Sequence, residues 1–275
     1  APDEVLKKVD AFLGSIVEAE KDYFHQHILS MGLTRSSNAN SGIDDDIIEI
    51  AGFPLTVPDS SKPQGDITKN FRYTYTLKQD LNHPMGDNVN YVVALTDQRL
   101  DTYSQFDTSS IVTSATRTFN LEGNPTSIFS RPSLDASITG FMVLLADKSL
   151  LSSQKYDLTF TGALTDSLVF SIGGFHDQRK FLINDLKSGY INGLALSNSY
   201  ISDSNILTEF EYEYSKYNAK ASYETYQSNS FGFNITSALG RGWGFKASLS
   251  HAKKSHFAEF PIFGKRKEEI NSANI

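Results

Sequence analysis

Apolar and polar residues alternate with a period of two through most of the chain after Tyr23. The clearest run covers residues 70–78, where Phe, Tyr and Leu alternate with Arg, Thr and Lys. Successive side chains of a β-strand point to opposite faces, so this period predicts strands that each carry one apolar face. Similar runs cover residues 89–95, 156–160, 168–172, 209–215, 231–235 and 243–249. The alternation therefore predicts an all-β protein.

The first 22 residues have a helical period instead. Leu6, Val9, Leu13 and Ile16 fall on one stripe, with charged residues between them. This spacing predicts an α-helix over residues 1–22. An isolated helix of this length is marginal in water, so we expect it to end a preceding helical domain or to dock on the β-domain. The β-domain is expected over residues 23–275.

The connections between the predicted strands are of two kinds. Tight turns are expected at Thr165–Ser167, Lys216–Asn218 and Gly240–Gly242. Long polar loops are expected at 38–66, 98–116 and 250–265. Short turns on one side and long loops on the other are typical of outer-membrane barrels. The pattern favours a transmembrane antiparallel up-and-down β-barrel.

The composition of the two strand faces supports the same interpretation. The chain has 19 Phe and 13 Tyr but 1 Trp and 3 Met, and the apolar face is built from bulky residues. The opposite face gathers charge, as at Glu209, Glu211 and Glu213, which suits a water-filled lumen. No apolar run approaches the roughly 20 residues of a spanning helix. A soluble β-sandwich or lipocalin-like binding protein is the alternative, because alternation alone does not say which face points inward.

Charge and composition exclude several classes of protein. The 275 residues have 25 Lys and Arg against 32 Asp and Glu, a net charge of −7, which argues against nucleic-acid binding. The chain has no cysteine, so disulfides, thiolate metal sites and cysteine nucleophiles are excluded. Neither a Ser-His-Asp constellation nor a nucleophile elbow is evident. We therefore expect a non-enzymatic protein without cofactor or metal.

Four other features have a functional and a plainer interpretation. His25 and His27 face one side of a strand, but a metal site would need further ligands. The run Asp44–Asp46 lacks the spacing of a calcium loop and is expected to be solvated. Gly240–Gly244 joins two strands and is expected to be a hairpin turn rather than a phosphate loop. A basic cluster is expected in a solvated loop, the alternative being contact with an acidic partner or lipid phosphates: Lys253, Lys254, Lys265, Arg266 and Lys267.

Three stretches together resemble the surface lipoprotein assembly modifier (Slam) family. The first is the initial helix running into a strand that closes on Asn38 and Asn40. The second is the hairpin series over about residues 156–250. The third is Phe263-Gly264-Lys265-Arg266, which is similar to the family's Phe-Gly-x-x-Arg-x-Asp element. The order of these elements carries the resemblance, which extends over nearly the whole chain.

The chain departs from the family pattern at three points. Serine stands at positions 36 and 37, where the family has an aspartate ahead of the asparagine pair. The arginine of the third motif, Arg266, comes one residue early, and Glu268 replaces the aspartate. The motifs are therefore shared in order and type rather than residue by residue.

The resemblance implies an outer-membrane translocon or assembly factor of a Gram-negative bacterium. Its barrel would help deliver lipoproteins or related exported proteins to the cell surface. Residues 1–22 would end a periplasmic domain of tetratricopeptide-like (TPR) repeats. The implied partners are a client surface lipoprotein and outer-membrane lipids, around a monomeric barrel. A passive porin or nutrient channel is the alternative, with Glu209, Glu211 and Glu213 lining its pore.

The two ends of the sequence carry one further expectation. Ala1 begins directly in folded-looking sequence without a signal peptide, and residues 265–275 start a strand without a later hairpin partner. A barrel with an open edge would leave backbone groups unpaired in lipid. The sequence therefore predicts a barrel that continues beyond this chain.

Overall fold

The computed structural model describes residues 22–40, 42, 47–50, 53–122, 128–240, 243–260 and 264–274. The predicted helix over residues 1–22 lies outside this part, apart from Asp22. The described residues form β-strands joined by turns and four short 3-10 segments, and no α-helix occurs among them. None of their helices is long and apolar enough to cross a membrane.

Twelve strands form one antiparallel sheet in which neighbours in sequence are neighbours in space, apart from the β2–β3 excursion. The antiparallel all-β prediction is confirmed. The strands are β1 (Tyr23–Ser36), β4 (Asp66–Asp80), β5 (Asn88–Leu100), β6 (Thr108–Asn120), β7 (Ser130–Leu145), β8 (Lys148–Thr165), β9 (Leu168–Phe181), β10 (Gly189–Ile201), β11 (Ile206–Ala219), β12 (Tyr226–Gly240), β13 (Trp243–Phe260) and β14 (Gly264–Asn274). Each predicted run falls within one of them.

The remaining elements lie in connections. The hairpin of β2 (Ile47–Ile50) and β3 (Phe53–Thr56) forms a separate two-stranded sheet between β1 and β4. The 3-10 segments are η1 (Asp59–Ser61), η2 (Ser104–Phe106), η3 (Asp185–Lys187) and η4 (Ser222–Glu224). They all lie at the end of the sheet where β1 ends, which we call the distal end; the proximal end is where β1 begins.

The register divides the sheet into an apolar face and a charged face. One row of paired residues on the apolar face consists of Leu29, Tyr73, Leu95, Ile111 and Met142 from consecutive strands. Many large side chains of this face are exposed, among them Leu158 at 53%, Leu194 at 59% and Leu249 at 58%. A water-soluble sheet would bury such a face, so its exposure across the whole sheet calls for an apolar environment or a partner.

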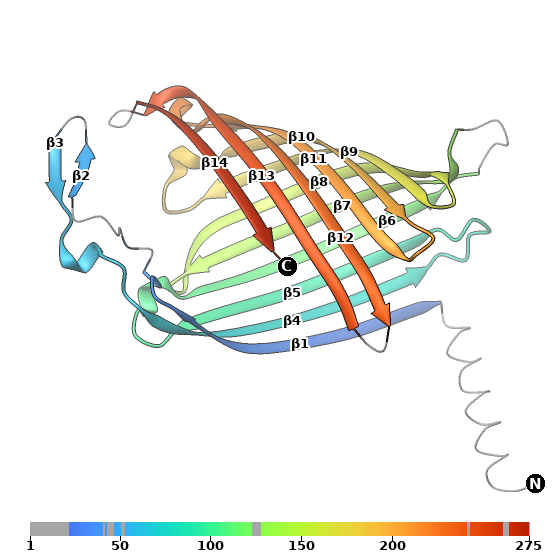
Figure 1. The fold of residues 1–275 in the computed structure, drawn as a ribbon, viewed down its shortest axis with the longest axis horizontal. Helices are drawn as coiled ribbons and strands as arrows, with labels where there is room; N and C mark the ends of the chain where they lie inside the picture. The colour runs from blue at the N-terminus through green and yellow to red at the C-terminus, as the bar shows by residue number, and fades with distance from the viewer. Residues whose placement is uncertain are drawn as a thin grey trace, which may run out of the picture.

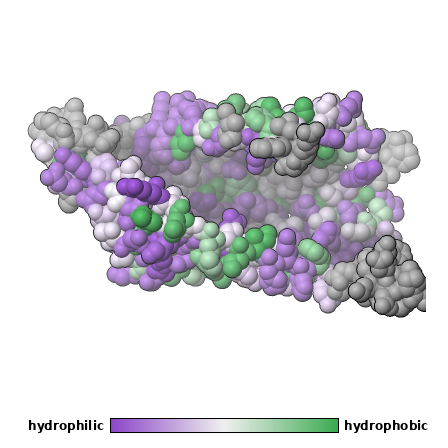
Figure 2. All heavy atoms as spheres, turned by 60° about the horizontal axis from the view of Figure 1, so that its bottom comes forward, coloured by the Kyte–Doolittle hydropathy of each residue, from purple (hydrophilic) through white to green (hydrophobic). Residues whose placement is uncertain are grey.

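The sheet curls so that the charged face lies inside. β12–β14 cross in front of the strands in the middle of the chain, and the space-filling view looks into a hollow between two rows of side chains (Figures 1 and 2). The most buried side chains of the strands belong to the charged face: Asp177, Ile191, Ser215, Tyr217 and His256. The core of this fold is therefore partly polar and lies on the concave side.

The sheet does not close into a barrel. β1 pairs with β4 on one side and β14 pairs with β13, but β1 and β14 are not hydrogen-bonded to each other. The predicted up-and-down β-barrel, expected to continue beyond this chain, is therefore confirmed only as an open antiparallel sheet. Closure requires hydrogen bonds between the two outermost strands, and alternation within a strand carries no information on them. The strand predicted at 265–275 is β14 (Gly264–Asn274), and it pairs with the preceding strand, β13.

Two of the three predicted tight turns are confirmed. Leu168 pairs with Thr165, and Gly240 with Trp243, so both segments are hairpins. Residues 241–242 themselves lie outside the described part. The turn predicted at Lys216–Asn218 is wrong, because these residues continue β11. The Lys216 ammonium lies 5.4 Å from the centre of the Phe257 ring, so this residue interrupts the alternation without ending the strand.

The predicted asymmetry of long and short loops is also wrong for two loops of three. Only residues 101–107 separate β5 from β6, and β13 and β14 occupy most of 250–265. The connection at 38–66 is long, but it contains β2, β3 and η1. A polar segment suggests a loop, but the hydrogen bonds of an antiparallel ladder join backbone groups and therefore continue through polar residues. The strands therefore extend well past their apolar stretches.

Candidate functional site

The three glutamates predicted to line a lumen do share the charged face of β11. Glu209 pairs with Ser199, Glu211 with Ser197 and Glu213 with Ala195 of β10. Glu213 also borders a small polar cavity on the concave side, together with Lys155 and Lys254. The arrangement gives this part of the interior a row of carboxylates at a spacing of two residues. A role of these side chains in conduction or transport stays a prediction.

A buried histidine lies at the centre of a polar cluster on the distal part of the charged face. The His256 side chain is 1% exposed, and its Nδ1 lies 3.0 Å from the carbonyl oxygen of Tyr223. Arg266 donates from Nε to His256 Nε2 over 3.2 Å. These contacts fit the tautomer in which Nδ1 donates to the carbonyl and Nε2 accepts from the guanidinium. The histidine thus joins η4 to β14 through β13.

Ion pairs extend this cluster across the last hairpin. Arg266 Nε lies 2.9 Å from Glu268 Oε1, and Arg266 Nη2 lies 3.4 Å from Glu224 Oε2 in η4. Lys254 donates to Glu268 Oε2 over 2.9 Å. Two motif positions, Arg266 and Glu268, therefore meet in one network, which holds β14 against β13. The network contains no nucleophile, and its charges satisfy one another.

The basic cluster predicted at the end of the chain is not a solvated loop. Lys253 and Lys254 belong to β13, where they pair with Glu269 and Glu268 of β14 over 2.9 Å each. Arg266 and Lys267 belong to β14. The loop interpretation is therefore wrong, and cross-strand pairing is the reason for the charge. Phe263 lies outside the described residues, and so does the side chain of Lys265.

A second polar cluster lies on the charged face of β8, β9 and β11. Asp177, 3% exposed, accepts from Arg179 Nε over 2.6 Å and from Ser153 Oγ over 2.8 Å. The hydroxyl of Tyr217 is buried beside this group without a hydrogen-bond partner among the described residues. The alternation of apolar and polar residues does not by itself predict this cluster. The signal in the sequence is a pair of charged residues two positions apart, as at Lys155 and Asp157, because such residues lie on the same face of a strand.

Asn38 and Asn40 tie together the two ends of the β1–β4 connection. Asn38 exchanges two hydrogen bonds with the backbone of Gly42, over 2.6 and 3.0 Å. Asn40 donates to the Lys62 carbonyl over 2.8 Å and accepts from Gln64 N over 2.9 Å. The asparagine pair therefore has a structural role here. It closes the base of a connection that leaves the sheet.

Replacing Asn40 by alanine should loosen this connection while the sheet stays intact. The change removes two good hydrogen bonds to partly buried backbone groups, a loss of about 1–2 kcal/mol in local stability. We expect limited proteolysis between residues 53 and 65 to be roughly tenfold faster, as that free energy implies. Asn198→Ala, in the middle of β10, is the matched control. Equal cleavage rates in the two variants would contradict the proposed role.

The predicted histidine pair lies on the apolar face of the edge strand β1. The rings of His25 and His27 are 5.7 Å apart, and His27 Nδ1 lies 2.8 Å from the Tyr73 hydroxyl. His27 also packs on Tyr75, with ring centroids 4.9 Å apart. The pair is thus part of an aromatic row. Groups of three or more metal-ligating residues are absent from the described part of the chain, and the Asp44–Asp46 run lies outside it.

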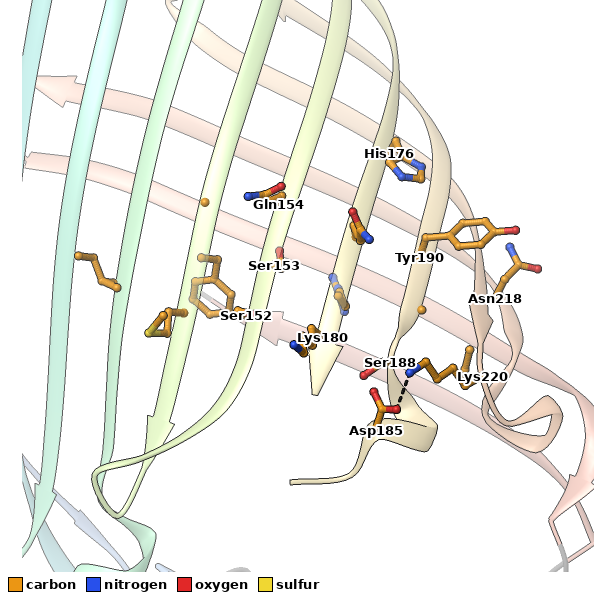
Figure 3. A pocket seen from close by; sticks show the side chains of 18 of the residues that line it. Ser152, Ser153, Gln154, His176, Lys180, Asp185, Ser188, Tyr190, Asn218 and Lys220 are labelled. Carbon is orange, nitrogen blue, oxygen red and sulfur yellow. Dashed lines mark hydrogen bonds and ion pairs between the residues drawn. The ribbon is translucent and has the colours of Figure 1, made fainter. Parts of the chain in front are cut away.

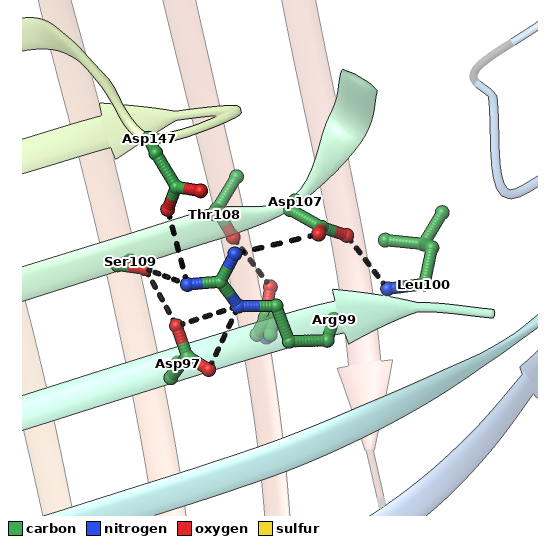
Figure 4. Close-up of polar contacts among 8 residues, drawn as sticks. Asp97, Arg99, Leu100, Asp107, Thr108, Ser109 and Asp147 are labelled. Atoms are coloured by element: carbon green, nitrogen blue, oxygen red, sulfur yellow. Dashed lines mark hydrogen bonds and ion pairs between the residues drawn. The ribbon is translucent and has the colours of Figure 1, made fainter. Parts of the chain in front are cut away.

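A charged cluster anchors two connections on the apolar face near the distal end (Figure 4). Arg99 lies 3.0 Å from Asp97, 3.4 Å from Asp107 and 3.2 Å from Asp147, a residue of the β7–β8 turn. Asp107 also accepts from Leu100 N over 2.8 Å. One guanidinium therefore links β5, the connection after it and the next hairpin. The outward face, apolar in its central part, therefore carries charged side chains near its distal end.

A cavity with a volume of about 1120 Å³ lies on the outward face of β6–β11 near the distal end. β12–β14 pass behind the strands that carry it (Figure 3). Lys220 and Asp185 form an ion pair at its rim, and the Lys220 ammonium lowers the pKa of the Asp185 carboxyl. This cavity was not foreseen from the sequence, because its lining comes from six strands.

The chain was compared with family models, curated proteins and solved structures, and none of them matches it.

Proposed function

We propose that the chain is an outer-membrane protein that helps deliver lipoproteins or related exported proteins to the bacterial cell surface. The observation that carries the membrane part is the exposure of large apolar side chains across the outward face, opposite a concave face rich in charge. This is the reverse of a soluble β-barrel, whose apolar residues fill the interior. Lipid would cover the outward face. The backbone groups at the outer edges of β1 and β14 would be hydrogen-bonded within a closed barrel wall, because lipid offers them no partner.

The assembly role rests on the order of elements that resembles the Slam family. Two of its motifs have clear structural roles here, since Asn38 and Asn40 fix the first connection and Arg266 fixes the last hairpin. In this proposal the residues before β1 end a periplasmic helical domain, as the resemblance implies, and the proximal end of the sheet faces the periplasm. A client lipoprotein would approach there and pass outward along the charged face or the seam. No catalytic step is needed.

Gene deletion tests the proposed transport. We expect client lipoproteins to become inaccessible to protease added to intact cells, while their total amount stays similar. Complementation with the intact gene is the control, and it should restore accessibility. Unchanged surface exposure of every lipoprotein would rule out the proposal.

A passive channel is the second candidate, and the carboxylate row of β11 favours it. Glu209, Glu211 and Glu213 could line a cation-preferring pore. Planar-bilayer conductance separates the two functions. A large and steady open conductance that loses cation preference in the triple Glu→Gln variant supports the channel, whereas a closed baseline supports the assembly factor.

A further inference from the structure

The outward cavity of β6–β11 combines an apolar side with a polar side. Ile111, Met142 and Gly140 line the apolar side, next to the exposed apolar face. Gly140 keeps the floor open, since a Cβ there would lie 3.1 Å from the Thr113 hydroxyl. The cavity is therefore a continuation of the apolar face into a recess, suited to an acyl chain.

The polar side carries positive charge. Lys180 is exposed and forms no ion pair within 4 Å among the described residues, and its charge also acts on the Asp185 carboxyl of the same cavity. Lys220, across the cavity, is held by Asp185 of η3 (Figure 3). Ammonium groups beside an apolar surface at a membrane boundary attract phosphate-bearing lipids. The cavity thus has a place for a phosphate at Lys180.

Neutral hydrogen-bonding side chains lie in the neighbouring row of the outward face, where Gln154 pairs with Gln178, Gln178 with Tyr190 and Tyr190 with Asn218. The three amide side chains of this row line the cavity, and Tyr190 adds an aromatic ring with a hydroxyl. Figure 3 shows Gln154, Tyr190 and Asn218. His176 Nδ1 is fixed 2.7 Å from Asn192 Oδ1, which orients that ring. Amides that both donate and accept are suited to sugar hydroxyls, which do the same. A simple phosphoglycerol headgroup would leave most of these groups and much of the roughly 1120 Å³ unused.

We propose that this cavity binds a phosphorylated glycolipid of the membrane, with its phosphate at Lys180, its sugar on the amide side chains and an acyl chain along Ile111 and Met142. The inference rests on the proposed membrane location. It adds a specific bound lipid to that location. The lipid site lies on the outward face of the sheet, whereas the client would pass along the charged face or the seam. Such a lipid would fix the depth of β6–β11 in the membrane.

Native mass spectrometry of the full protein in a non-ionic detergent tests the binding. The probes are a bis-phosphorylated glucosamine-disaccharide lipid, its dephosphorylated form, and phosphatidylglycerol. We expect the first to be retained at least tenfold better than either of the others. Lys180→Glu should reduce its retention by roughly tenfold or more, because the charge beside the phosphate changes by two units, from positive to negative. Lys78→Glu, on the charged face of β4, makes the same charge change away from the cavity and should have no effect.

The outcomes separate this inference from the proposed function. Retention of phosphatidylglycerol equal to that of the glycolipid would overturn the sugar assignment, and so the proposal. So would equal retention by the Lys180→Glu and Lys78→Glu variants. If the chain is absent from the membrane fraction, the proposed function itself fails before any lipid is added. If lipoprotein display depends on the gene but lipid retention does not depend on Lys180, only the lipid site is lost.

Discussion

Replacing Leu194 by arginine should destabilise the protein in a bilayer by about 2–4 kcal/mol, the cost measured for a cation on the lipid face of a membrane β-barrel. Leu194 lies in β10 in the middle of the sheet, points outward and is 59% exposed. In lipid an arginine there would lose its hydration. Urea unfolding of the protein reconstituted in vesicles measures the difference.

The same substitution distinguishes a membrane sheet from a soluble one. In water an exposed Leu→Arg change is usually within about 0.5 kcal/mol. The matched control is Ser197→Arg, three residues along the same strand but on the charged face opposite Glu211. We expect that variant to be neutral in both media. If Leu194→Arg is also neutral in vesicles, lipid does not cover the outward face.

Gly189→Ala should cost about 3 kcal/mol, in the upper part of the usual range for overpacking. A Cβ at Gly189 would lie 2.1 Å from the Asn218 carbonyl oxygen and 2.8 Å from the Cα of Ala219. Both are backbone atoms of β11, so no side-chain rotation relieves the clash. The start of β10 would have to move away from β11, next to the outward cavity. The midpoint of denaturant unfolding measures the loss.

Gly174→Ala is the matched control for this substitution. A Cβ at that position would meet Leu194 at 3.6 Å, an ordinary contact. Alanine also restricts the unfolded chain more than glycine, so this variant should be neutral or slightly more stable. Equal midpoints for the two alanine variants would contradict the close approach of β10 and β11.

The clusters on the charged face show how far the sequence leads toward the site. Alternation predicts that Glu209, Glu211 and Glu213 share one face, and the register agrees. It does not predict that Arg266 meets His256 and Glu224, because these residues come from three elements brought together by pairing over 42 positions. Such contacts depend on register and curl, which the local pattern does not encode.

The sequence by itself determined the secondary structure type, the central part of each strand and the separation of an apolar from a charged face. These follow from one physical rule, the period of two in side-chain direction. The tertiary structure alone decided where the strands end, because ladder hydrogen bonds continue through polar residues such as Lys253 and Lys254. It also decided that β1 and β14 do not pair with each other and that residues of six strands line the outward cavity. Both depend on the total twist and curl of the sheet, to which every pair of neighbouring strands contributes.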